Sequence, residues 1–148
     1  MSTQGEDRKR IVAGVDGSRI SLQALRKARQ LAEVLDCALE VVTVGEHAIS
    51  LTPPVATEIW SPHTEAEEVL RDAVRDAFGD DVPPGLQRTA LVGNPAKMLI
   101  EASRGAEMLV VGNRGRGGFA GLLLGSVSAT VASHASCPVL IIHRTESD

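Results

Sequence analysis

The stretch from Met108 to Ser128 holds the residue types best suited to binding an anion. An apolar run at its start precedes a loop rich in glycine, and apolar residues at helical spacing resume after Ser126. Glycine lets main-chain N–H groups approach a phosphate closely, and the first turn of a helix adds N–H groups that lack an intrahelical partner. The stretch therefore predicts a phosphate-binding strand, loop and helix, with Ser126 and Ser128 capping the helix or donating hydroxyls to phosphate.

Two common phosphate loops do not fit this stretch. A Walker A loop requires Gly-Lys-Ser/Thr, and no lysine lies between residues 108 and 128. Gly115, Gly117 and Ala120 give G-x-G-x-x-A, but in dinucleotide-binding folds this pattern follows the first strand and precedes an acidic residue by about twenty positions. Residues 132–142 contain no acid. The remaining alternative is a surface loop without a ligand. The conformational entropy lost by ordering its glycines would then have no compensating interaction.

The spacing of four residues in the stretch resembles a known motif. Gly112, two residues, Gly115, nine residues and then Gly125-Ser126 match the ATP-binding motif of the universal stress protein family, G-x2-G-x9-G-(S/T). The resemblance covers residues 11–143 and implies an adenine nucleotide as the ligand.

Asp16 follows the predicted first strand, at a place where the family has an aspartate. By resemblance, its carboxylate hydrogen-bonds the adenosine part of the nucleotide; the alternative is a turn-forming aspartate before Gly17. The resemblance also implies that the end of the first strand lines the adenine pocket. At the end of the second strand, main-chain groups of Val42, Thr43 or Val44 are expected to face adenine, and the sequence does not fix which.

Arg114 occupies a variable position of the motif, where it pairs with a phosphate, stacks near the ribose or is solvated. Val127 and Ser128 follow the motif, and we expect them to contact phosphate through N–H and hydroxyl groups. The predicted nucleotide-binding residues are therefore Gly14, Val15, Asp16, Val42, Gly112, Arg114, Gly115, Gly125, Ser126, Val127 and Ser128.

The elements that must position these residues alternate along the chain. Short apolar runs predict buried strands, and apolar residues recurring every three or four positions predict amphipathic helices between them. Strict alternation predicts an α/β fold with a five-stranded, mainly parallel sheet and helices on both faces. The resemblance implies the Rossmann-like strand order 3-2-1-4-5. The predicted strands are residues 10–15, 39–44, 86–92, 108–111 and 138–143.

Ligands of such sheets bind beyond the carboxyl ends of the strands, where the strand order reverses. Asp16 and Gly112 both stand at such ends, so one site is expected to contain them. Asn94 and Pro95 are typical of the N-cap and first position of a helix. Gly45 to His63 is predicted to be irregular, and its Trp60 is expected to cover the site, meet a partner chain or pack on the sheet edge.

Composition narrows the class of protein. A chain of 148 residues is most simply a single domain, residues 1–148, with a polar arm at 1–9 and a polar tail at 144–148. A net charge of −4 and 2% aromatic residues argue against nucleic-acid binding. No apolar run is long enough to span a bilayer, so we expect no membrane association and a cytoplasmic location.

The candidate chemistry is binding more than catalysis. The four histidines occur singly, and no nucleophile motif is present. We expect an ATP-binding universal stress protein, a nucleotide-dependent regulator in the stress response, with Mg²⁺ or Mn²⁺ accompanying a triphosphate. A slow ATPase and a sensor of AMP or cyclic AMP are the alternatives. The apolar edge from Pro138 to His143 predicts a homodimer through the last strand, unless the N-terminal arm or the tail covers that edge.

Overall fold

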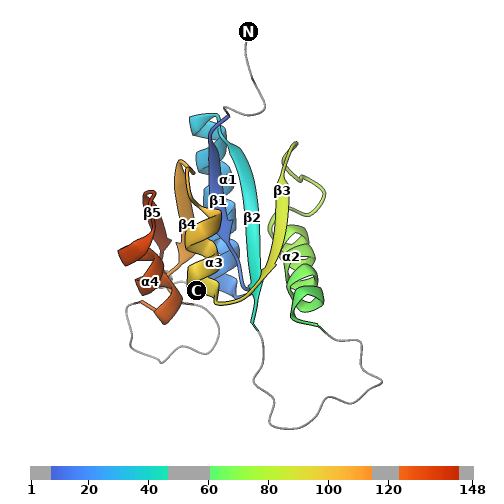
Figure 1. Cartoon of the computed structure of the whole chain (residues 1–148). Helices are drawn as coiled ribbons and strands as arrows, with labels where there is room; N and C mark the ends of the chain where they lie inside the picture. The colour runs from blue at the N-terminus through green and yellow to red at the C-terminus, as the bar shows by residue number, and fades with distance from the viewer. Residues whose placement is uncertain (1–7, 47–60, 115–123, 144–148) are drawn as a thin grey trace.

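The computed structural model describes residues 8–46, 61–114 and 124–143, and these form one five-stranded sheet between two layers of helices (Figure 1). All neighbouring strands are parallel, and their order is β3-β2-β1-β4-β5. The predicted α/β class and strand order are confirmed. The strands are β1 (Arg10–Gly14), β2 (Ala38–Gly45), β3 (Gln87–Val92), β4 (Met108–Gly112) and β5 (Val139–Ile142).

The helices cover both faces of the sheet, two on each side. Side chains alternate between the faces along a strand, so Val41 packs in the core with the first two helices while Val42 packs in the core with the other two. Ile11, Val12 and Ala13 of the central strand are fully buried because both of their faces are covered. The helices are α1 (Arg19–Leu35), α2 (Pro62–Phe78), α3 (Pro95–Ala102) and α4 (Ser126–His134).

Side-chain caps explain where three of the helices begin. Ser18 caps α1 by accepting a hydrogen bond from the Ser21 N–H group at 3.3 Å. The Asn94 side chain accepts from the Lys97 N–H group at 3.0 Å, and Pro95 opens α3. This confirms the interpretation of Asn94 and Pro95.

The predicted boundary of the irregular stretch Gly45–His63 is wrong at both ends. Gly45 completes β2. Ser61 caps α2 by accepting from the Thr64 N–H group at 3.1 Å, and Pro62 is the first helical residue, where its missing N–H group costs nothing. Residues 47–60, including Trp60, lie outside the described segments.

The two ends of this connection lie against each other. A Cβ atom built on Gly45 would come within 2.2 Å of the Pro62 carbonyl oxygen, so only glycine fits at the end of β2. The first turn of α2 is therefore held beside the carboxyl end of the sheet. No helix of the described segments combines the length and the apolarity that a bilayer crossing requires.

Candidate functional site

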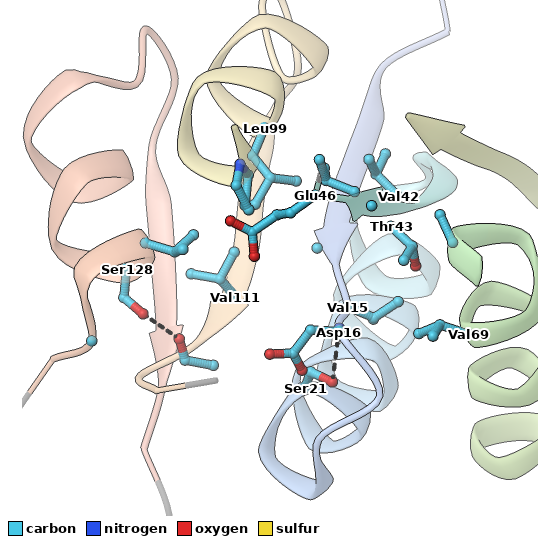
Figure 2. A pocket seen from close by; sticks show the side chains of 18 of the residues that line it. Val15, Asp16, Ser21, Val42, Thr43, Glu46, Val69, Leu99, Val111 and Ser128 are labelled. Atoms are coloured by element: carbon cyan, nitrogen blue, oxygen red, sulfur yellow. Dashed lines mark hydrogen bonds between the residues drawn. The ribbon is translucent and has the colours of Figure 1, made fainter. Parts of the chain in front are cut away.

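A pocket of about 370 Å³ opens at the carboxyl end of the sheet, where the order of the strands reverses (Figure 2). The ends of β1, β2 and β4 form its floor, and residues from the first two turns of α2 and α3 and the first turn of α4 form its walls. The structure brings ten of the eleven predicted residues to this pocket, and Gly115 lies outside the described residues. The ten are Gly14, Val15, Asp16, Val42, Gly112, Arg114, Gly125, Ser126, Val127 and Ser128.

One end of the pocket carries the N-terminus of α4. The first intrahelical bond runs from the Ala129 N–H group to the Gly125 carbonyl at 2.9 Å, so the N–H groups of Ser126, Val127 and Ser128 have no acceptor within the helix. Gly125 is the N-cap and offers no capping side chain. The expectation that Ser126 caps the helix is therefore wrong, since Ser126 is already the first helical residue. An uncapped first turn suits an anionic ligand.

The Ser128 side chain joins this turn to the sheet. Its hydroxyl is buried and lies 2.8 Å from the carbonyl oxygen of Gly112 and 2.9 Å from that of Asn113. A hydroxyl has a single proton to donate, and here it is directed to the main chain. The group that Ser128 presents for a ligand is thus its N–H group. The Gly125 N–H group donates to the Asn113 carbonyl at 2.7 Å and ties the same two elements together.

Gly112 is required by packing. A Cβ atom at this position would lie 2.9 Å from Cγ2 and 3.1 Å from Cγ1 of Ile20, on the first turn of α1. The close approach of α1 to the end of β4 therefore excludes a side chain. This reason for the glycine is independent of any phosphate.

Asp16 forms a turn at the edge of the pocket. Its Oδ1 atom accepts a hydrogen bond from the Ser18 N–H group at 2.9 Å, and its own N–H group donates to Ser21 Oγ at 3.3 Å. The turn-forming interpretation is confirmed. Figure 2 shows the half-buried carboxylate at the pocket, so Asp16 is also placed to meet a ligand.

Main-chain groups of β2 face the other end of the pocket. The Val42 carbonyl accepts from the Val15 N–H group at 2.9 Å, and the Gly45 carbonyl accepts from the Gly93 N–H group at 2.9 Å. Successive residues of a strand direct their N–H and carbonyl groups alternately toward the strand on one side and the strand on the other. Val44 thus faces the side on which β1 has ended, and no main-chain group of the described residues pairs with it there.

Several lining residues could not be predicted from the sequence. Glu65 and Val69 reach the pocket from the first two turns of α2, and Leu99 reaches it from the second turn of α3. Glu46 follows the end of β2, whereas Thr43, near that end, was one of the three residues expected to face adenine. The only partial signal was the helix-starting pair Asn94-Pro95, which placed the start of α3 near this edge.

The charges of the pocket are mixed. Asp16, Glu46 and Glu65 contribute carboxylates, and Arg114 contributes the single cation among the lining residues that the structure describes. Within the described segments, no group of three or more metal-ligating side chains is present.

Comparison with known proteins decides the family. The model of the universal stress protein family matches residues 7–143. The chain belongs to the universal stress protein family.

Individual universal stress proteins are similar over most of the chain. Universal stress protein Rv2005c of Mycobacterium tuberculosis is 34% identical over 143 residues, covering 93% of this chain and 48% of the relative. The chain thus spans about half the length of that relative. YxiE of Bacillus subtilis is 28% identical over 144 residues, covering 90% of this chain and 97% of YxiE. A universal stress protein crystallised in complex with cAMP is 30% identical, with a TM-score of 0.69 and coverage of 93% of this chain and 98% of that one.

Proposed function

We propose that the pocket binds an adenine nucleotide and that its occupancy regulates partner proteins in a stress response. The observation that supports this most is the pairing of two kinds of main-chain group in one pocket of about 370 Å³. The uncapped turn of α4 offers N–H groups for phosphate at one end. Val44 offers both an N–H group and a carbonyl at the other.

The distance between the two ends of the pocket, which follows from the order of the strands, sets the length of the ligand. The anion-binding turn lies over β4, the Val44 groups belong to β2, and β1 lies between them. Two strand spacings separate the ends by roughly 10 Å. The sugar of a nucleotide would then lie over the end of β1, beside Asp16, where a carboxylate can accept hydrogen bonds from ribose hydroxyls.

The Val44 groups favour adenine over guanine. Adenine presents an amino group next to a ring nitrogen that accepts, which matches a carbonyl next to an N–H group. Guanine presents a carbonyl next to a ring N–H group, so two carbonyls would face each other and two N–H groups would face each other. We assign this recognition to Val44 instead of Val42, because the Val42 carbonyl is already engaged by Val15.

The proposal must also say how many phosphates the bound nucleotide carries. The motif at Gly112, Gly115, Gly125 and Ser126 supports ATP, with Mg²⁺ or Mn²⁺ bound through the phosphates and neighbouring carboxylates. AMP or cAMP is the second candidate, because a universal stress protein that is 30% identical was crystallised with cAMP. The three carboxylates at the pocket also favour a ligand with less negative charge.

The remaining parts of the proposal concern assembly and turnover. The β5 edge, with its half-buried Val139–Ile142, would pair with the same strand of a second copy within the cytoplasm. We expect hydrolysis of ATP to be slow, because the sequence offers no recognisable arrangement of a general base for activating water. Occupancy, rather than turnover, would then carry the signal.

Titration calorimetry with ATP, AMP, cAMP and GTP tests the proposal. We expect at least one adenine nucleotide to bind at micromolar concentration and GTP to bind at least tenfold more weakly. A variant that fills the anion end, Gly125→Val, should lose the binding. Ala132→Val adds bulk to the exposed side of the same helix and should keep it. Absence of binding by all three adenine nucleotides, or equal binding of GTP, would contradict the proposal.

A further inference from the structure

Thr43 has a hydroxyl that the fold does not use. The residue is 3% exposed, and its Oγ1 atom has no hydrogen-bond partner among the residues that the structure describes. Buried hydroxyls are nearly always hydrogen-bonded, because an unpaired one has lost its contact with water without compensation. This cost is avoidable, since valine has the same shape and no polar atom.

The surroundings of Thr43 on the sheet are apolar. The preceding residue on the same face, Val41, belongs to the core beneath α1 and α2. Figure 2 shows the Thr43 side chain directed toward Val15 and Val69, and all three residues line the pocket. These neighbours provide packing for the methyl group and no partner for the hydroxyl. The pocket is the direction from which a partner can arrive.

Thr43 also precedes the residue that is placed to read the base. The Val44 main chain faces the space beyond β1, and the Thr43 side chain leaves β2 one residue earlier. A base held by Val44 would pass close to this side chain. A turn about the Cα–Cβ bond exchanges the hydroxyl and the methyl between staggered positions, and it would bring Oγ1 into the pocket.

We propose that the Thr43 hydroxyl hydrogen-bonds the bound base and so contributes to the specificity of the site. The inference rests on the proposed function. A hydroxyl can accept a proton from the adenine amino group or donate its own to a ring nitrogen. Binding would then satisfy a polar group that no described residue pairs with, and the gain would appear as affinity.

The pair Thr43→Val and Thr43→Ser tests the inference. The valine variant keeps the shape and loses the hydroxyl, whereas the serine variant keeps the hydroxyl and loses the methyl. We expect Thr43→Val to bind AMP roughly fivefold more weakly, as for the loss of one net hydrogen bond, and Thr43→Ser to bind within about twofold of the wild type. Without ligand, Thr43→Val should melt at the same or a higher temperature than the wild type, because the unpaired hydroxyl is gone.

The opposite signs of these effects separate base recognition from a structural role. A structural threonine would lose thermal stability and affinity together in the valine variant, and this result would overturn the inference. Equal affinity of the wild type and Thr43→Val for AMP would overturn it while leaving the proposed function in place. If the wild type binds no adenine nucleotide, the proposed function itself fails, and the inference fails with it.

Base analogues identify the atom that Thr43 contacts. The N7-deaza, N3-deaza and N6-monomethyl forms of AMP each remove one candidate hydrogen bond. We expect one of them to bind the wild type and Thr43→Val with equal affinity, because the contact is already absent. A fivefold difference that persists with all three analogues would show that the hydroxyl does not contact the base, and it would overturn the inference.

Discussion

The hydroxyl of Ser128 lies 2.8 Å from the carbonyl oxygen of Gly112, so a side chain on the first turn of α4 holds the end of β4. The N–H groups proposed to bind phosphate belong to that turn. Their position relative to the sheet therefore depends on this buried contact.

Replacing Ser128 with alanine should loosen the anion end. We expect Ser128→Ala to lower the free energy of unfolding by about 1–2 kcal/mol, because the buried hydroxyl that links α4 to the end of β4 is lost. Nucleotide affinity should fall as well, since the helix turn is less firmly held. Denaturant unfolding and calorimetry measure the two effects. The exposed Ser126 makes a matched control, and Ser126→Ala should leave stability within about 0.5 kcal/mol. Equal stability of both variants would contradict the positioning role.

Replacing Gly125 with aspartate should separate stability from binding. Gly125 has φ −76° and ψ 173°, a conformation open to any residue, and it occupies an uncapped N-cap. Aspartate would accept hydrogen bonds from the first turn of α4 and raise stability by about 0.5–1 kcal/mol. It would also occupy the donors and add negative charge where phosphate is proposed to bind.

We therefore expect Gly125→Asp to melt at a higher temperature and to lose most of its affinity for nucleotide, as measured by thermal scanning and calorimetry. Ala132→Asp carries the same charge farther along α4 and should bind normally. Undiminished affinity of Gly125→Asp would place the phosphate elsewhere.

Gly112→Ala should destabilise the fold through a steric clash. The new Cβ atom would meet Cγ2 of Ile20 at 2.9 Å, and overpacking of this kind costs about 1–3 kcal/mol. Denaturant unfolding of a double-mutant cycle with Ile20→Ala measures the coupling. The double variant should be more stable than the sum of the single effects predicts. Simple additivity would mean that the glycine is needed for another reason.

Asp16→Asn and Asp16→Ala should distinguish the role of this residue in the turn from its proposed role in binding the ligand. Asparagine can still accept from the Ser18 N–H group, so we expect it to keep stability within about 0.5 kcal/mol. Alanine loses the turn bond and should cost about 1 kcal/mol. Calorimetry should show weaker nucleotide binding for both variants, because the carboxylate proposed to meet the ribose is gone. Wild-type affinity in Asp16→Asn would restrict Asp16 to its turn.

The two cysteines should react with thiol reagents at different rates. Burial raises the pKa of the Cys37 thiol, whereas Cys137 is half-buried. The thiolate is the reactive form, so in the native protein near pH 8 we expect Cys137 to be labelled first. Mass spectrometry of quenched samples measures the order. In denaturant the rates should converge, and a native Cys37 as fast as Cys137 would contradict the burial of that thiol.

The fold was largely predictable because alternation and parallel pairing leave few topologies. The start of α2 was missed although Ser61-Pro62 has the same N-cap and proline types as Asn94-Pro95. His63 and Thr64 are polar and exposed, so the apolar period begins only after the first turn. A capping pair therefore predicts a helix start most clearly where apolar residues follow it at once, as they do after Asn94-Pro95.

The candidate site was predictable where it depends on strand ends. Parallel strands bring their carboxyl ends to one edge, so Asp16, Val42 and Gly112 could be placed together from the sequence. Val69 and Leu99 could not, because their place depends on how far each helix extends past the sheet. The sequence also cannot tell that the Ser128 hydroxyl turns to the main chain, since a serine at a helix start is equally suited to a ligand.

The contact between Gly45 and the carbonyl of Pro62 brings the two ends of the connection between β2 and α2 together at one point. A loop that is closed at its base can be lengthened at a small entropic cost. Residues 47–60 are therefore a suitable place to insert a fluorescent reporter or an affinity tag. The strand and the helix on either side of such an insertion should keep their register, because their contact at Gly45 and Pro62 does not depend on the length of chain between them.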